Sequence, residues 1–72
     1  MTQQEAERIV REKYPDVWMT FDDELNAGNI YKGYFEQGGF RFPQSLLCSI
    51  FSKDKIAEAW INASEKIKQQ SI

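Results

Sequence analysis

Apolar residues recur at helical spacing at both ends of the chain and not between residues 16 and 51. Near the N-terminus they fall on one face of a helix: Ala6, Ile9, Val10 and Tyr14. Thr2 and Glu5 match a capping box, in which each side chain satisfies a backbone N–H at a helix start. Pro15 disfavours helical geometry at the residue before it. The pattern therefore predicts a helix over residues 3–13.

A second helical stripe occupies the last part of the chain and comprises Ile56, Ala59, Trp60, Ala63 and Ile67. Ser52 precedes it as a candidate N-cap, and Asp54 places a negative charge in the first turn, where the helix dipole favours it. The charged residues fall on the opposite face: Glu58, Glu65, Lys66 and Lys68. We expect a second, longer helix that begins after Ser52.

The middle of the chain reads as strands. Residues 17–21 and 30–37 are rich in strand formers, and the polar stretch between them, residues 22–29, is typical of a loop. Gly38 and Gly39 form a turn signal, after which residues 40–42 open a third strand. Pro43 lacks a backbone N–H, so the third strand is either bent there or lies at a sheet edge.

Residues 46–51 are ambiguous because periodicity does not separate a strand from a helix in so short an apolar run. They either continue the third strand after a bulge, form a fourth short strand, or start the last helix early. We favour a strand. The chain is then a single small α+β domain over residues 1–72, in which a helix, a three-stranded antiparallel meander and a second helix follow one another (αβββα). Both helices are expected on one face of the sheet.

Alternation along the strands predicts which side chains face the helices. The consistent solution buries seven residues: Val17, Met19, Phe21, Tyr31, Phe35, Phe40 and Phe42. Ile30 then falls on the open face of the sheet, together with the four residues that form our candidate binding site: Trp18, Lys32, Tyr34 and Arg41. Tryptophan, tyrosine and arginine are enriched in interface hot spots, whereas ordinary cross-strand pairing is the alternative reason for such a cluster.

Composition excludes several classes of function. Eleven acidic against nine basic residues give a formal net charge of −2, which argues against nucleic acid as the partner. The chain has no histidine, and its one cysteine, Cys48, lies in an apolar run, so we expect no enzyme and neither a cofactor nor a metal. We read residues 22–24 as a solvated turn. No apolar run has the length of a membrane span, and the first residues do not resemble a secretory signal, so we expect a cytoplasmic protein.

These observations favour a small protein-binding module, a regulator or an inhibitor of the kind that phages encode, which acts through the open sheet face. Four acidic residues are expected to form a patch that steers it to a basic partner: Asp16, Asp22, Asp23 and Glu24. One alternative is a structural homodimer, in which a second copy covers the open face. Another is an RNA-binding domain, because the order of elements is that of double-stranded RNA-binding domains. Those domains start their last helix with basic residues, but here Asp54 interrupts Lys53 and Lys55, and their loop motifs are absent.

Overall fold

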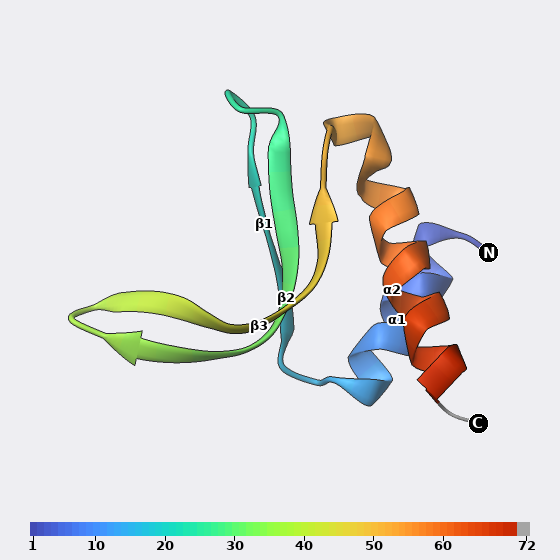
Figure 1. Ribbon diagram of the computed structural model, residues 1–72, viewed down its shortest axis with the longest axis horizontal. Coiled ribbons are helices and arrows are strands. Elements are labelled where there is room, and N and C mark those ends of the chain that lie inside the picture. The colour runs from blue at the N-terminus through green and yellow to red at the C-terminus, as the bar shows by residue number, and fades with distance from the viewer. Residues whose placement is uncertain (71–72) are drawn as a thin grey trace.

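The computed structural model describes residues 1–70. In chain order, it contains α1 (Gln3–Lys13), β1 (Val17–Asp22), β2 (Ala27–Gln37), β3 (Phe40–Ile50), a 3-10 turn (Lys53–Lys55) and α2 (Ile56–Gln70). The three strands form one antiparallel sheet in the order β1-β2-β3, and the two helices lie side by side against one face of it (Figure 1). The αβββα arrangement predicted from the sequence is confirmed.

The first helix has the predicted bounds, and local chemistry explains both ends. At its start, the Thr2 hydroxyl accepts a hydrogen bond from the Glu5 backbone N–H at 3.2 Å. At its end, the Tyr14 N–H still bonds to the Val10 carbonyl at 2.8 Å, and Pro15 then sends the chain into β1. A capping side chain of this kind typically contributes about 1 kcal/mol to stability.

The second helix begins differently from our expectation. Ser52 precedes the 3-10 turn, but its side chain makes no capping bond to the backbone. Its hydroxyl instead donates a hydrogen bond to the Asp54 carboxylate, while the Ser52 carbonyl accepts from the Lys55 N–H at 3.0 Å. The turn closes the corner between β3 and α2 before the α-helix proper starts at Ile56.

The ambiguous stretch after Pro43 belongs to β3, which confirms the strand and excludes an early start of the helix. The register changes where Ile30 pairs with Cys48 and Tyr31 pairs with Leu46, so Leu47 is the extra residue of a bulge. Pro43 lies in β3, an edge strand, where a missing N–H is tolerated. The first loop is shorter than expected, because β2 already begins at Ala27.

The core lies between the two helices and the half of the sheet nearest to them. Its buried members are Ala6, Val10, Val17, Ile30, Ile50, Ala59, Trp60, Ala63 and Ile67. Trp60 is 1% exposed and has the largest of the fully buried side chains. Of the expected α2 stripe, Ile56 is only half-buried, but it packs against this core. The helical faces predicted from spacing are therefore those that the structure buries.

The facing of β2 was predicted wrongly. Ile30 pairs with Met19 and is fully buried, whereas Tyr31 pairs with Trp18 on the opposite face of the sheet. A strand shifted by one residue turns every side chain to the other face. From the sequence we assigned the aromatic Tyr31 to the buried face of the sheet. The structure instead buries the aliphatic Ile30. Met19, expected to be buried, is partly exposed on the edge strand β1.

β1 begins at Val17, opposite Lys32 of β2. Past this N-terminal end of β1, the strands β2 and β3 continue as a two-stranded ribbon that bends away from the helices (Figure 1). We call this ribbon, residues 33–44, the arm. Its phenylalanines were expected in the core, but Phe35, Phe40 and Phe42 are 52%, 70% and 41% exposed. An 11-residue strand spans about 36 Å, whereas the 15-residue α2 spans only about 22 Å. The helices are too short to cover both halves of the hairpin.

Gly33 lies where the arm leaves the sheet. Its φ of +70° is in the left-handed region, which a residue with a Cβ adopts only at a cost. A Cβ at this position would also collide with the side-chain oxygen of Gln44. The bend therefore depends on glycine, and it turns the Tyr34 face of the arm toward Trp18.

Candidate protein-binding surface

Trp18 lies at the base of the arm on the outer face of the sheet. Its indole N–H donates a hydrogen bond to the Gly33 carbonyl at 3.0 Å. Its ring packs against Tyr31, with 5.0 Å between the ring centroids and a tilt of 40°. The half-buried Trp18 thus fixes the residue at which the arm bends and still offers part of its ring to solvent.

Arg41 joins the arm to this tryptophan. Its guanidinium group lies 4.3 Å from the centroid of the Tyr34 ring and 5.9 Å from that of Trp18. It also lies 4.0 Å from the Glu36 carboxylate, in an exposed pair of small energetic value. The structure therefore brings together three of the four residues predicted for the open face, namely Trp18, Tyr34 and Arg41. The guanidinium is already oriented by two aromatic rings.

Lys32, the fourth predicted residue, lies elsewhere. It pairs with Val17 and so points to the helix side of the sheet, where its ammonium group is 4.4 Å from the centroid of the Tyr14 ring. This is the same facing error that misplaced Ile30. Lys32 stabilises the end of α1 and does not belong to the outer surface.

The predicted acidic patch is divided. Asp16 lies just before the start of β1, whereas Asp22, Asp23 and Glu24 lie at its other end. The length of the strand, roughly 20 Å, separates the two groups. The Asp22 carboxylate is occupied within its own turn, where it accepts from the backbone N–H groups of Glu24 at 2.9 Å and Leu25 at 3.3 Å. The structure does not support a joint surface of all four acids.

The other face of the arm carries the aromatic residues that the sequence assigned to the core. Phe35 and Phe42 pair across the strands and stack, with their ring centroids 5.5 Å apart. Phe40 lies on the same face, next to the turn. The sequence holds one signal for the exposure of these phenylalanines. The strands on either side of the Gly38–Gly39 turn are longer than the first helix, so this helix does not cover them along their whole length.

We call the combined area the arm surface. It consists of the outer-face cluster and the three phenylalanines of the arm: Trp18, Tyr34, Arg41, Phe35, Phe40 and Phe42. Each side chain is at least partly exposed. Within the described residues 1–70, no helix covers either face of the arm (Figure 1). The arrangement offers large aromatic rings and one oriented cation, which are residue types enriched in binding hot spots.

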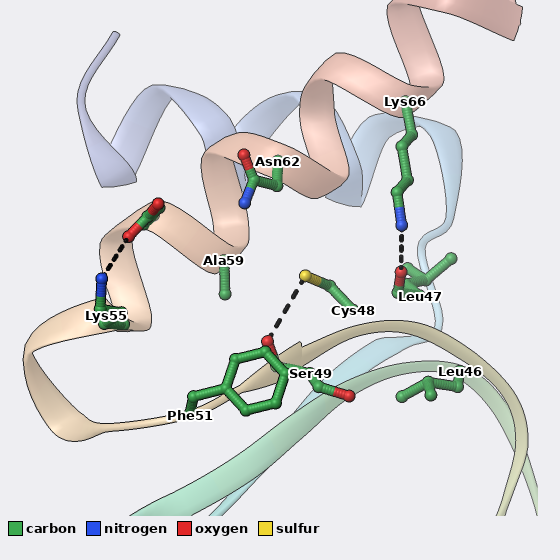
Figure 2. A pocket seen from close by; sticks show the side chains of 10 residues that line it. Leu46, Leu47, Cys48, Ser49, Phe51, Lys55, Ala59, Asn62 and Lys66 are labelled. Atoms are coloured by element: carbon green, nitrogen blue, oxygen red, sulfur yellow. Dashed lines mark hydrogen bonds and ion pairs between the residues drawn. The ribbon is translucent and has the colours of Figure 1, made fainter.

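A groove of about 630 Å³ lies between β3 and α2 (Figure 2). Cys48 points into it, and its thiol donates to the Ser49 carbonyl at 3.6 Å. The Lys66 ammonium group reaches across from α2 to the Leu47 carbonyl at 3.4 Å (Figure 2). Within residues 1–70, no three potential metal ligands of the histidine, cysteine or carboxylate type gather at one place.

Comparison of the chain with protein-family models, with curated proteins and with solved structures finds no significant match. The helices within residues 1–70 are all too short or too polar to cross a membrane. The arm surface itself is therefore the feature from which a function can be inferred.

Proposed function

We propose that the chain is a small, non-enzymatic protein-binding module of the cytoplasm, a regulator or an inhibitor, and that it binds through the arm surface. One observation carries the proposal. The arm projects from the folded body with aromatic side chains on both of its faces, although burying them in the core would stabilise a domain of this size.

The exposed area is large for so small a protein. If an aromatic side chain offers about 200 Å², the exposed parts of Phe35, Phe40 and Phe42, which share one face of the arm, amount to roughly 330 Å². Patches of this size on monomeric proteins are often functional. A standard interface takes about 800 Å² from each partner, so a partner would also have to contact Trp18 and Arg41.

The arm also lacks its own support. A two-stranded ribbon is only marginally stable in water unless something packs against it. Apart from its strand pairing, the arm is held by the stack of Phe35 on Phe42 and by the contacts of Trp18 and Arg41 at its base. A bound protein would supply the missing cover.

The charges favour a protein over a nucleic acid as the partner. Arg41 lies next to Glu36, and three further basic residues have acidic partners, in the pairs Arg8–Glu12, Arg11–Glu7 and Lys55–Glu58. Affinity for nucleic acid comes mostly from basic side chains that neutralise phosphates, and four of the nine basic residues here each have a carboxylate within 4.0 Å.

Site-specific photo-cross-linking in cells tests the proposal. A photoreactive phenylalanine analogue replaces Phe40, and the same analogue at Phe51 is the matched control, because Phe51 is 80% exposed but lies outside the arm. We expect a discrete protein adduct from position 40 and none of the same mass from position 51.

The protein identified in this way is then purified and its affinity measured. Tyr34→Ala and Arg41→Glu should each weaken binding about 30-fold, as expected for hot spots worth about 2 kcal/mol. Leu25→Ala, an exposed apolar residue of the β1–β2 turn, should leave the affinity unchanged. Equal adducts from positions 40 and 51, or adducts with nucleic acid alone, would contradict the proposal.

A further inference from the structure

A pocket of about 350 Å³ lies on the helix side of the sheet, where α2 passes β2 and β3. It adjoins the groove between β3 and α2, because Lys66 lines both of them. Pockets for small ligands typically have about 300–1,000 Å³, so this one has room for a small organic molecule. Its apolar walls are formed by Tyr14, Leu46, Leu47, Ala63 and Ile67. We call it the lysine pocket, because Lys32 and Lys66 both line it.

Besides Tyr14, four side chains that donate hydrogen bonds line the lysine pocket, two from the sheet and two from α2. Lys32 and Ser45 lie directly opposite each other on β2 and β3, so their side chains share one face, with the Cβ atoms about 5 Å apart. Lys66 and Gln70 are one turn apart on α2, which places them on one side of the helix. The sheet thus contributes one ammonium and one hydroxyl group, and the helix contributes one ammonium and one amide group.

The two ammonium groups are held in place without a counter-charge. That of Lys32 lies 4.4 Å from the centroid of the Tyr14 ring, and that of Lys66 donates to the Leu47 carbonyl at 3.4 Å (Figure 2). Among residues 1–70, neither lysine has a carboxylate within 4.0 Å, and no acidic residue lines the pocket. An ammonium group has three donor hydrogens, so each lysine retains donors for a ligand.

We propose that the lysine pocket binds a small organic phosphate monoester. The phosphate group lies between Lys32 and Lys66, and the organic part packs against the apolar walls. A phosphate monoester carries about −1.5 to −2 charges at pH 7, which two ammonium groups balance, whereas a carboxylate balances only one. The Ser45 hydroxyl and the Gln70 amide donate to the remaining phosphate oxygens. None of these residues belongs to the arm surface, so the inference does not rest on the proposed function.

The dipole of α2 is another reason for positive charge near the C-terminal end of this helix, and it favours Lys66 and Lys68 alike. It gives no reason for Lys32, which belongs to β2 and lines the same pocket from the sheet. Lys68 is two positions from Lys66, so it points to a different side of α2, and it does not line the pocket. Lys68 is therefore a matched control, with the same charge at the same helix end.

A titration of the isotope-labelled protein with phenyl phosphate, followed by backbone amide chemical shifts, tests the proposal. Phenyl phosphate combines one phosphate monoester group with one small apolar ring. We expect saturable shifts in residues 45–47 and 63–70, with a dissociation constant on the order of 1 mM or lower. The amides of Gly38 and Gly39, in the turn of the arm, should not shift.

Substitution of the lysines tests their role. Lys66→Gln leaves one ammonium group for the phosphate and should weaken binding at least about tenfold, whereas Lys68→Gln should leave the affinity unchanged. Ser45→Ala removes a neutral donor and should weaken binding less than Lys66→Gln. Lys32→Gln should match Lys66→Gln, although it also loses the contact with Tyr14. The same spectra show whether each variant is folded, so Lys66→Gln decides if Lys32→Gln does not fold.

Two further ligands identify the chemistry that the pocket selects. Inorganic phosphate lacks the apolar ring, and benzoate has the ring but only a single charge, so both should bind more weakly than phenyl phosphate. Absence of saturable shifts with phenyl phosphate, or equal weakening by Lys66→Gln and Lys68→Gln, would overturn the site. Inorganic phosphate that binds as tightly as phenyl phosphate would overturn the organic ligand, and benzoate that does so would overturn the phosphate.

Discussion

The side-chain carbonyl of Asn26 accepts a hydrogen bond from the Lys53 backbone N–H at 2.8 Å, across 27 residues of sequence. Asn26 is the last residue of the β1–β2 turn, and its φ of +51° lies in the left-handed region. Lys53 begins the 3-10 turn that leads into α2. One side chain therefore both completes a tight turn and attaches that turn to the start of the second helix.

The two roles of Asn26 separate by substitution. Asn26→Gly accepts the positive φ but loses the hydrogen bond, and we expect a loss of about 1 kcal/mol in the free energy of unfolding. Asn26→Ala loses the bond and strains the turn, so the loss should be about 2 kcal/mol. Urea denaturation measures both, with the exposed Asn62→Ala as control. A glycine variant as stable as wild type would show that the link to Lys53 contributes nothing.

Trp60 should dominate the stability of the domain. Trp60→Ala removes the largest fully buried side chain and is expected to cost about 3–5 kcal/mol, close to the whole stability of many small domains. Within the described residues, the indole N–H of Trp60 has no acceptor. Trp60→Phe removes that unpaired donor along with part of the ring, so it should cost distinctly less than Trp60→Ala.

Thermal unfolding followed by circular dichroism measures these losses. Phe51→Ala is the control, because Phe51 is a large but exposed aromatic residue. It should melt within a few degrees of wild type. A Trp60→Ala variant that unfolds cooperatively near the wild-type temperature would contradict the role assigned to the contact between α2 and the core.

Gly33→Ala should destabilise the protein through the backbone and through a collision with Gln44. The positive φ alone is expected to cost about 1–2 kcal/mol. The double variant Gly33→Ala/Gln44→Ala removes the collision with the side-chain oxygen and leaves the backbone strain and a tight contact with the Cβ of residue 44. Chemical denaturation should therefore give the double variant a free energy of unfolding between those of wild type and Gly33→Ala. If Gly33→Ala is as stable as wild type, the bend of the arm does not depend on glycine.

Asp54 gives the corner before α2 a dependence on pH. The hydrogen bond from the Ser52 hydroxyl, followed by one from the Asp54 backbone and by the charge of Lys55, lowers the pKa of the Asp54 carboxyl from its usual 3.8. A pKa that folding lowers stabilises the folded state above pH 3.8, and this stabilisation is lost as the pH falls through the folded-state value.

Ser52→Ala removes the main cause and should move the pKa of Asp54 back toward its usual value. A titration followed by the side-chain carboxyl resonance measures the change. Lys55→Ala serves as a comparison and should produce a smaller shift, because the charge of Lys55 contributes less than the hydroxyl. A larger shift in Lys55→Ala than in Ser52→Ala would contradict the assigned order of causes.

The parts of the fold that could be predicted from sequence are those with local causes. Thr2, Glu5 and Pro15 determine the bounds of α1 through contacts with their own neighbours in the chain. The Gly38–Gly39 turn likewise sets the pairing of the arm, because a two-residue turn fixes the register of its flanking strands.

The parts that could not be predicted depend on distant partners. Whether Ile30 or Tyr31 faces the core depends on the register between β1 and β2, which no short stretch encodes. This error also misplaced Lys32 in the candidate site. The exposure of Phe35, Phe40 and Phe42 depends on the relative lengths of the sheet and of two helices at opposite ends of the chain.

The packing of α1 against α2 has a consequence for synthesis of the chain. The apolar side of α1, formed by Ala6 and Val10, is buried in one core with Trp60 and Ala63 of α2. α1 therefore leaves the ribosome before α2, the helix it packs against. Until residues 56–70 emerge, the nascent chain lacks the cover that α2 gives to α1, and the domain completes its core only after α2 has been synthesised.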